Sequence, residues 1–373
     1  MKKRIDLIYL ETVILLLSFG ILAIYSTTFY EKSFFPKALS TSYFDRTLMG
    51  AGIGLVILFL SMVINLSFYY SKSKILGIIQ LPVAGSVFLW ILFFSAIFYN
   101  AFRVLTNKEE VARSIGGHFQ PQEFFKYAHL FLLAYLAEKK INDWWLVLLS
   151  LIGTIVLFSQ KAVGTAFIFF LFCVTFFFFV LRLKTIHIFL YTLFVATFIS
   201  IGIWKIPYAR KRFEEFWIRK KKKVDLAKID WRNLAHQDHA RIAIASGKLF
   251  GRGLGRGLQK FGFLAWVRTD FIFANICEEM GFIGALALLF LFFILFWRGL
   301  LIASAFHFGF EYMVASGISI IFCLYFFVHV FVSLDIIPCT GQPLPFVSYG
   351  GSALASNLWA VGTVLNISHS RKN

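Results

Sequence analysis

The stretch VRTDFIFANICEEMGFIGALALLFLFFILFW, residues 267–297, leads from a basic loop into an apolar run of the length that crosses a bilayer. Asp270 lies where the two parts meet. A charge beside hydrocarbon costs roughly 2.5 to 3.5 kcal/mol on insertion scales, so its presence needs a reason. Two interpretations follow: Asp270 is a boundary residue kept in water, or it is a carboxylate that does chemistry at the membrane surface.

The composition of the whole chain is that of a membrane protein. Hydrophobic residues make up 59% of the 373 residues, aromatic residues make up 19%, and the mean hydropathy is +0.76. A water-soluble fold could not bury all 48 Phe residues. The sequence therefore predicts a polytopic membrane protein and excludes a soluble globular domain.

Apolar runs near or above the roughly 20 residues that a membrane helix needs recur along the chain. We predict an all-α polytopic membrane protein with about ten transmembrane helices in a single domain, residues 1–373. The predicted helices are 8–27, 48–69, 75–98, 121–138, 143–160, 163–182, 185–205, 271–297, 311–334 and 350–368. Residues 206–270 are expected to form one large extracytoplasmic loop between helices 7 and 8.

The orientation in the membrane is predicted from Lys and Arg in the short loops. The first span follows Met1-Lys2-Lys3-Arg4 as in a signal peptide, but it is too long and has no convincing cleavage site, so we expect it to be retained. With the N-terminus inside, the cytoplasmic positions hold Lys2, Lys3, Arg4, Lys72, Lys74, Lys139, Lys140, Arg182, Lys184, Arg298, Arg371 and Lys372. The opposite short loops hold fewer, namely Lys32, Lys37, Arg46, Arg103, Lys108, Arg113 and Lys161. An even number of helices then places both termini in the cytoplasm.

The net charge and the cysteines indicate which partners and metal sites can be expected. The net charge of +18 is dispersed around the predicted spans, so we expect anionic lipids as its partner and no nucleic acid. The cysteines occur singly, without metal-ligand spacing, and are interpreted as packing residues: Cys173, Cys277, Cys323 and Cys339. No metal site is predicted from the spacing of possible ligands.

Two patterns in the 206–270 loop point to lipid. Aromatic and basic residues interleave over 208–223, which suits a helix lying in the membrane interface, although a solvated cationic loop fits the same composition. Further on, GRGLGRG at 251–257 offers backbone amides and the guanidinium groups of Arg252 and Arg256, which could hold a diphosphate. An ordinary glycine-rich turn is the alternative, because neither a Walker loop nor a dinucleotide-binding signature is present.

Three other segments place polar or Gly/Pro-rich chain at membrane depth. QPQEFFK at 120–126 puts Glu123 and Lys126 on one helical face, where an ion pair at the helix start is the simpler interpretation. Residues 159–166 separate two apolar runs, and residues 338–352 hold too much Pro and Gly for a regular span. Irregular backbone at that depth must be covered by protein or line a wet cavity, so we expect a cavity near the outer leaflet.

Several motifs along the chain carry a further signal. They are Gln120-Pro121 with Glu123 and Lys126, FGRG at 250–253 followed by Gln259-Lys260, TDFIFA at 269–274, Glu278-Glu279, GFIGA at 281–285 and PLPFVSYGGS at 343–352. Together they resemble the SEDS family, which includes RodA, FtsW and SpoVE, over nearly the whole chain. Asn366-Ile367-Ser368 and the stretch 257–260 resemble the FtsW branch slightly more than RodA.

The resemblance implies a ten-helix peptidoglycan glycosyltransferase that joins lipid II into glycan strands for cell division or cell shape. It would work at the outer face of the bacterial inner membrane with a class B penicillin-binding transpeptidase. The favoured catalytic residue of the family falls on Asp270, which would act as a general base on the acceptor hydroxyl. Because the leaving group is a lipid diphosphate, cationic and polar residues are candidates for substrate binding. These candidates are Lys126, Glu123, Arg252, Arg256, Gln259, Lys260, Arg268 and Ser348.

The chain departs from the family pattern beside Asp270. Leu-Pro-Glu-x-His usually precedes Thr-Asp, whereas here Ala265, Trp266, Val267 and Arg268 follow the leucine, and Lys161-Ala162 replace a Pro-Asp pair. We favour an active polymerase in which Arg268 takes the cationic role of the missing His. A non-catalytic lipid II-binding scaffold for a transpeptidase and a lipid II flippase stay open. A metal requirement also stays open, because a divalent cation could bridge Asp270 and a diphosphate.

Overall fold

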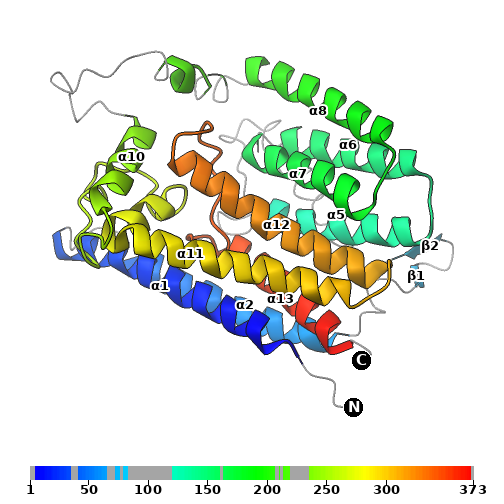
Figure 1. The fold of residues 1–373 in the computed structure, drawn as a ribbon, viewed down its shortest axis with the longest axis horizontal. Coiled ribbons are helices and arrows are strands. Elements are labelled where there is room, and N and C mark those ends of the chain that lie inside the picture. Colours follow the sequence, from blue (N-terminus) through cyan, green and yellow to red (C-terminus); the bar gives the residue numbers. More distant parts are fainter. Residues whose placement is uncertain are drawn as a thin grey trace.

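The computed structural model describes residues 5–34, 41–64, 72–75, 79–82, 120–159, 163–205, 210, 213–218 and 235–370. Most of these residues form long helices that run side by side (Figure 1). The helices are α1 Leu7–Phe34, α2 Thr41–Val63, α5 Pro121–Glu138, α6 Asp143–Ser159, α7 Val163–Thr175, the π-helical η1 Phe176–Val180, α8 Thr185–Lys205, α10 His236–Gly247, α11 Ile272–Ser304, α12 Phe310–Ser333 and α13 Gly351–Ser370. The prediction of an all-α polytopic membrane protein is confirmed as a fold class, while the number of helices and the position of the large loop stay predictions.

Local sequence explains several helix boundaries. Helix α5 starts with Pro121 because proline fits the first turn, where its missing N–H would have no intrahelical partner, and Gln120 before it is extended. The predicted starts and ends of α5 and α8 agree with the structure, whereas α2 begins at Thr41, earlier than the predicted 48. The polar residues of TSYFDR form the first turns of α2, and an apolar run alone cannot reveal such turns.

The third predicted span, 75–98, is wrong over its described residues, 75 and 79–82, which form strands. Strand β1, Lys72–Ile75, pairs antiparallel with β2, Ile79–Pro82, so the chain forms a hairpin at the point where a helix was expected to begin. Isoleucines flank the short connection, and Pro82 ends the second strand, a place where proline is tolerated. Residues 83–98 lie outside the described residues.

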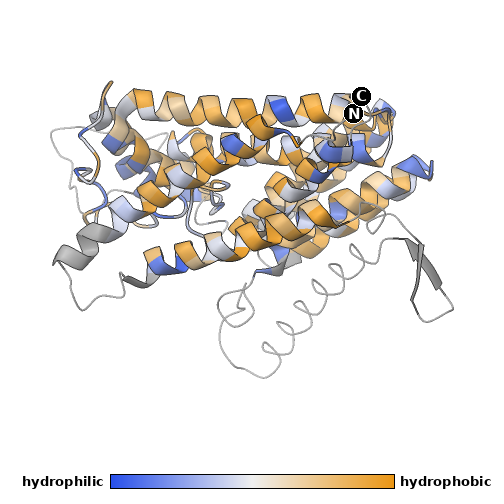
Figure 2. Ribbon diagram, turned by 90° about the horizontal axis from the view of Figure 1, so that it is seen from below, coloured by the Kyte–Doolittle hydropathy of each residue, from blue (hydrophilic) through white to orange (hydrophobic). Residues whose placement is uncertain are grey.

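Several helices have the length and apolar character of membrane spans. Within the part of the chain that the structure describes, five such stretches are Leu7–Thr28, Tyr43–Val63, Val163–Val180, Ile272–Ser304 and Phe310–Ser333, while α6 and α8 are shorter apolar helices. Hydrophobic residues dominate the lengths of the helices, and hydrophilic residues collect toward their ends (Figure 2). The molecule is a multi-pass membrane protein.

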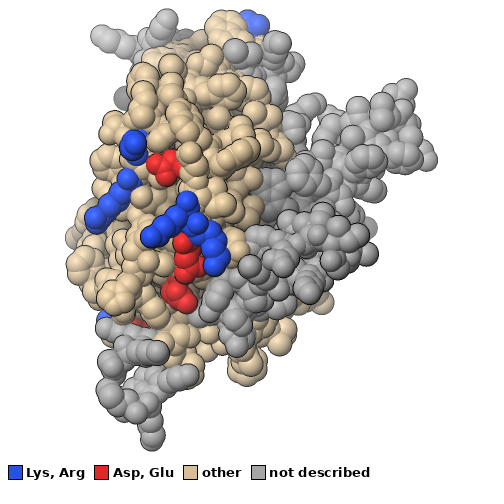
Figure 3. Space-filling view, turned by 90° about the vertical axis from the view of Figure 1, so that its right-hand side faces the viewer, with Lys and Arg blue, Asp and Glu red and all other residues tan. Residues whose placement is uncertain are grey.

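The helix ends define two ends of the molecule. At one end, here called the terminal end, the Asp6 N–H donates to Ser368 Oγ at 3.2 Å and Arg298 Nε donates to Asp6 Oδ1 at 3.3 Å. Lys and Arg side chains lie beside Asp and Glu side chains on this end (Figure 3). The opposite end, the loop end, carries α10 and the segments 248–271 and 334–350 (Figure 1).

Helix α11 is interrupted at Gly281. Its φ of 67° and ψ of −162° belong to a region that only glycine adopts readily, and a Cβ there would overlap Gly251 N. Before the break, residues 271–279 are buried; after it, Phe282 and Ile283 are exposed. The part from Phe282 to Ser304 is roughly 34 Å long at 1.5 Å per residue, enough to cross the hydrocarbon core. The predicted single span 271–297 therefore consists of a short helix enclosed by protein and a longer helix that faces lipid.

The segment 248–253 takes up the backbone groups freed by this break. Arg252 N–H and Gly253 N–H donate to Glu278 O and Glu279 O, each at 2.9 Å. In return, the amides of Phe282 and Ile283 donate to Lys248 O and Leu249 O at 2.8 and 3.2 Å. Unpaired backbone groups at this depth would be costly, so the segment and the kinked helix stabilise each other.

Candidate functional site

Asp270 lies at the loop end, immediately before α11. Its backbone N–H donates to Trp266 O at 3.0 Å, as does that of Thr269, so a tight turn presents the carboxylate. The residue is partly buried, and the Cys339 thiol lies 3.9 Å from Asp270 Oδ2. Asp270 is therefore partly exposed, and its carboxylate lies against the Pro/Gly-rich segment 334–350.

The segment 334–350 fixes the backbone of the two residues just before Asp270. Tyr349 N–H donates to Arg268 O at 2.9 Å, and Ser348 Oγ donates to Thr269 O at 2.7 Å while accepting from Leu344 N–H at 2.9 Å. Ser348 was predicted to bind substrate. In the structure it is buried and positions the backbone next to Asp270.

The same segment joins the other polar stretches that the sequence singled out. Gln342 Nε2 donates to Thr165 Oγ1 at 3.1 Å, and the backbone passes so close to α7 that a Cβ on Gly164 would overlap Thr340 O. Gln120 N–H at the start of α5 donates to Ser352 Oγ at 3.0 Å. Segments 120–126, 163–166 and 338–352 therefore meet at the loop end together with Asp270.

Glu123 and Lys126 form a buried ion pair on the first turns of α5. Lys126 Nζ lies 2.7 Å from Glu123 Oε2, and the two side chains are only 5% and 2% exposed. The ammonium also lies 4.2 Å from the centre of the Tyr325 ring. The predicted pairing on one helical face is confirmed, and any contact of Lys126 with substrate would have to form beside this pair.

The glycine-rich stretch 251–257 and the two residues after it do bind anions, but these anions are carboxylates of the protein itself. Glu278 Oε1 accepts from Leu258 N–H at 2.8 Å, Glu278 Oε2 accepts from Gln259 N–H at 3.1 Å, and Glu279 Oε2 accepts from Gly255 N–H at 3.1 Å. These amides are thus committed to internal carboxylates. What the stretch still offers a diphosphate is the exposed side chain of Arg256 and that of Arg252, which is exposed although its Nε lies 3.9 Å from Glu278 Oε1.

The remaining predicted residues differ in exposure. Lys260 is buried and paired with Glu279 at 2.6 Å, whereas Gln259 is partly buried, with Oε1 at 2.9 Å from His239 Nδ1 of α10. Arg268 lies 4.8 Å from the centre of the Tyr43 ring and donates to Thr27 O at 3.4 Å. Its guanidinium thus contacts α1 and α2, where the prediction had given it the role of a missing His.

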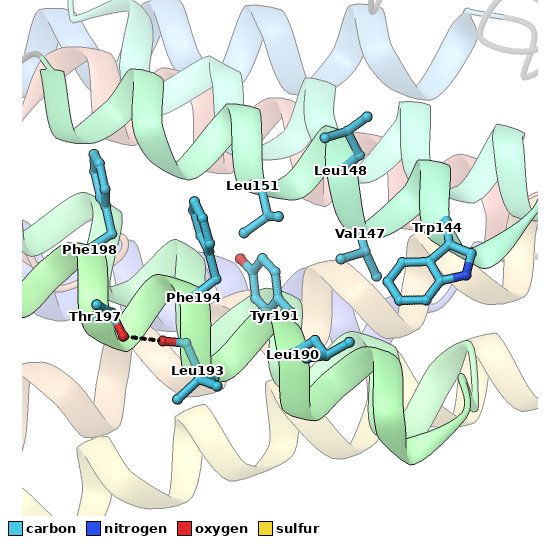
Figure 4. A pocket seen from close by; sticks show the side chains of 10 residues that line it. All are labelled: Trp144, Val147, Leu148, Leu151, Leu190, Tyr191, Leu193, Phe194, Thr197 and Phe198. Carbon is cyan, nitrogen blue, oxygen red and sulfur yellow. Dashed lines mark hydrogen bonds between the residues drawn. The ribbon is translucent and has the colours of Figure 1, made fainter.

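A hollow of about 520 Å³ opens between α6 and α8. Its lining is almost wholly apolar, with Trp144 near one end and Phe194 and Phe198 near the other, and Thr197 Oγ1 is bonded to its own helix at Leu193 O, 2.8 Å (Figure 4). None of the candidate residues lines this hollow. It suits hydrocarbon chains and gives no polar path for a headgroup.

The possible metal ligands among the described side chains do not cluster. Among the residues that the structure describes, no group of three or more His, Cys, Asp or Glu side chains gathers around one point. A divalent cation at Asp270 would have one carboxylate from the protein and would take its other ligands from a diphosphate and water.

Three features of the site were not identified from sequence. Cys339 beside Asp270, Ser26 beside Lys260, and the use of Glu278 and Glu279 as anchors for loop amides all depend on contacts between distant segments. The pair Glu278-Glu279 was part of a recognised motif, and two carboxylates in an apolar run were a signal that a buried polar network surrounds them. Nothing in the sequence around Cys339 or Ser26 distinguishes them.

Comparison with known proteins gives consistent matches. A family model described as "Cell cycle protein", for FtsW, RodA and SpoVE, matches residues 6–373. Stage V sporulation protein E of Bacillus subtilis is 30% identical, with 98% of each chain covered. A probable peptidoglycan glycosyltransferase FtsW of Trichlorobacter lovleyi is also 30% identical, covering 97% of this chain and 93% of the relative. Peptidoglycan glycosyltransferase MrdB of Escherichia coli is 43% identical over 37% of each chain.

Solved structures share the fold. A chain from a structure titled "Structural coordination of polymerization and crosslinking by a peptidoglycan synthase complex" aligns with a TM-score of 0.69 and 22% identity over 98% of both chains. The rod shape determining protein RodA of Thermus thermophilus aligns with a TM-score of 0.62 and 22% identity, over 99% of this chain and 98% of that one. Relatives from several branches match, so the slight leaning toward the FtsW branch stays a prediction.

Proposed function

This chain belongs to the FtsW, RodA and SpoVE family of cell cycle proteins, and we propose that it is a peptidoglycan glycosyltransferase that polymerises lipid II with Asp270 as general base. The relatives that it resembles along nearly their whole length include one named as such an enzyme. The proposal concerns the substrate, the role of each residue and the side of the membrane on which the chemistry occurs.

The observation that carries the proposal is the placement of Asp270. Asp270 is a partly exposed residue at the loop end, and bonds from Ser348 and Tyr349 fix the backbone just before it. A general base must be held in place and reachable by substrate, and a boundary residue that merely stays in water would need no such support.

The proposed reaction forms one bond and breaks another. Asp270 accepts the proton of the acceptor sugar hydroxyl, the hydroxyl oxygen bonds to the anomeric carbon of the donor, and the bond to the lipid diphosphate breaks. Negative charge then develops on the diphosphate, and exposed guanidinium groups stabilise it. Arg256 is the first candidate in the 251–257 stretch, because its side chain is exposed while Lys260 is enclosed. Arg252 is the second candidate, since its exposed side chain is already shared with Glu278 at 3.9 Å.

The surroundings of the reaction are part of the same proposal. The loop end would face the outside of a bacterial inner membrane, with both chain termini in the cytoplasm, as the distribution of Lys and Arg predicts. A class B penicillin-binding transpeptidase would act on the product, and a structure with this fold comes from a complex described as coordinating polymerization and crosslinking. Anionic lipids would neutralise the basic loops.

The test is polymerisation of fluorescent lipid II by the purified protein, alone and with a cognate transpeptidase. Asp270→Asn should lower the rate by about 10² to 10⁴-fold, because it removes the proton acceptor with little change in shape. Asp238→Asn is the matched control, since Asp238 is a partly buried aspartate on α10 at the same end. Full activity of Asp270→Asn would remove this residue from the mechanism.

The same experiment addresses the scaffold alternative. Ala265, Trp266 and Arg268 replace the usual neighbours of Asp270, while Lys161 and Ala162 lie outside the described residues. Retained lipid II binding with no product under any condition would favour a non-catalytic partner. Product that survives chelation of divalent cations would show that no bridging metal is required.

A further inference from the structure

Lys260 is enclosed in a polar cluster formed by three distant parts of the chain. Its ammonium donates to Glu279 Oε1 at 2.6 Å, to Ser26 Oγ at 3.0 Å and to Ser26 O at 3.1 Å. A lysine has three N–H donors, so all of them are engaged. With 1% of its side chain exposed, Lys260 offers nothing to a phosphate.

Glu279 completes the cluster and connects it to the glycine-rich stretch. The Ser26 hydroxyl donates to the Glu279 carboxylate, with oxygen distances of 2.7 and 2.6 Å, and Gly255 N–H donates to Glu279 Oε2 at 3.1 Å. The backbone carbonyl of Glu279 accepts from Gly253 N–H at 2.9 Å. One residue next to the break in α11 thus holds α1, Lys260 and the stretch 251–257 together.

The next residue of α1 holds the other end of the same segment. Thr27 O accepts from Arg268 Nη2 at 3.4 Å, and the Arg268 guanidinium stacks on Tyr43 of α2. Consecutive residues of α1 therefore bind positions 260 and 268, which bound the stretch leading to Asp270. A buried ion pair contributes little net stability compared with apolar packing, but it fixes geometry because only one arrangement satisfies every donor.

We propose that Lys260 and Glu279, through Ser26 of α1, are positioning residues that, together with the contact between Arg268 and Thr27, hold Asp270 in register with the membrane-embedded helices. This inference rests on the proposed glycosyltransferase function. Lys260 then acts on the reaction through geometry, and the contacts to diphosphate are left to the exposed Arg252 and Arg256. Misplacing a catalytic group by about 1 Å lowers a rate by as much as 10²-fold, so the cluster need not touch substrate to matter.

The test uses Glu279→Gln in the full-length protein in nanodiscs. The kcat of this variant for lipid II should fall by about tenfold to a hundredfold, because the Asp270 carboxylate is displaced from the bound acceptor hydroxyl. KM should change little, because the groups that bind substrate are intact. Hydrogen exchange should also accelerate, by roughly an order of magnitude or more, at the amides of Leu264, Thr269 and Asp270, which are hydrogen-bonded in the intact turn. Ser26→Ala keeps the ion pair and should show both effects more weakly, which provides a second variant if Glu279→Gln does not fold.

Arg256→Gln is the contrasting variant, since Arg256 is an exposed cation on the neighbouring stretch. It should raise KM and leave hydrogen exchange in 261–270 unchanged. A Glu279→Gln protein with raised KM, unchanged kcat and unchanged exchange would overturn the proposal, and so would faster exchange without loss of kcat. If the wild-type protein forms no polymer, the proposed function fails, while the exchange measurement still decides whether the cluster holds the segment.

Discussion

Replacing Gly281 with Ala should destabilise the protein strongly, although it adds a single methyl group. The φ of 67° and ψ of −162° would cost a non-glycine residue about 1 to 3 kcal/mol. The new Cβ would also overlap the backbone at Gly251 N and lie 2.5 Å from Leu249 O, and backbone cannot move aside as a flexible side chain can. Displacing it weakens the four bonds between 248–253 and α11, each contributing about 0.5 to 1.5 kcal/mol net. The expected loss in the free energy of unfolding is therefore about 2 to 7 kcal/mol if two or three of these bonds are broken.

The assay is thermal unfolding in detergent, followed with a thiol-reactive dye that reports exposure of the buried Cys173 and Cys277. A loss of this size should lower the midpoint by roughly 4 °C or more, taking the sensitivity of larger soluble domains as a guide. Gly52→Ala is the control, because Gly52 lies inside α2 with nothing within 4 Å of the added Cβ. That change should be neutral or stabilising by up to about 1 kcal/mol. Equal midpoints for the two variants would refute the idea that the break in α11 requires glycine.

Two further predictions concern the candidate site. Lys126→Met should lower the free energy of unfolding by about 3 to 5 kcal/mol, because it leaves Glu123 as an unpaired buried charge. Adding Glu123→Gln should restore most of the thermal stability while lipid II use stays low. A Lys126→Met protein that melts like the wild type would contradict the pairing. Alkylation of Cys339 should block glycan synthesis, because its thiol lies 3.9 Å from Asp270 Oδ2. The Cys339→Ser protein should synthesise glycan normally and resist the alkylating reagent. Equal inhibition of both proteins would place the reactive thiol elsewhere.

Much of the fold was predictable because a membrane helix leaves a strong local signal. An apolar run of about 20 residues has few alternatives in a bilayer, since every backbone group must be bonded within the segment. The predicted helices 121–138 and 185–205 agree with α5 and α8 for this reason. The hairpin at 72–82 was missed because a short apolar run with isoleucines fits a strand as well as a helix.

The candidate site was predictable in part. Asp270 stood out as a carboxylate at a membrane boundary, and Glu123 and Lys126 were placed as a pair by helical spacing alone. The roles of the other polar residues could not be read in the same way. Lys260 and Arg256 look equivalent in sequence, yet one is enclosed with Glu279 and Ser26 while the other is exposed.

The sequence by itself determined that this chain crosses a membrane many times, which residues could carry its chemistry, and to which family it belongs. These properties depend on composition, on local periodicity and on motifs of a few residues. Only the tertiary structure decided which groups are already satisfied, because hydrogen bonds and ion pairs join positions far apart in the chain. The Glu278 and Glu279 carboxylates occupy amides within the glycine-rich stretch and directly after it, at Gly255, Leu258 and Gln259, and α1 holds the segment before Asp270. A charge is free to bind a substrate only when no internal partner neutralises it, and that depends on the packing of the folded chain.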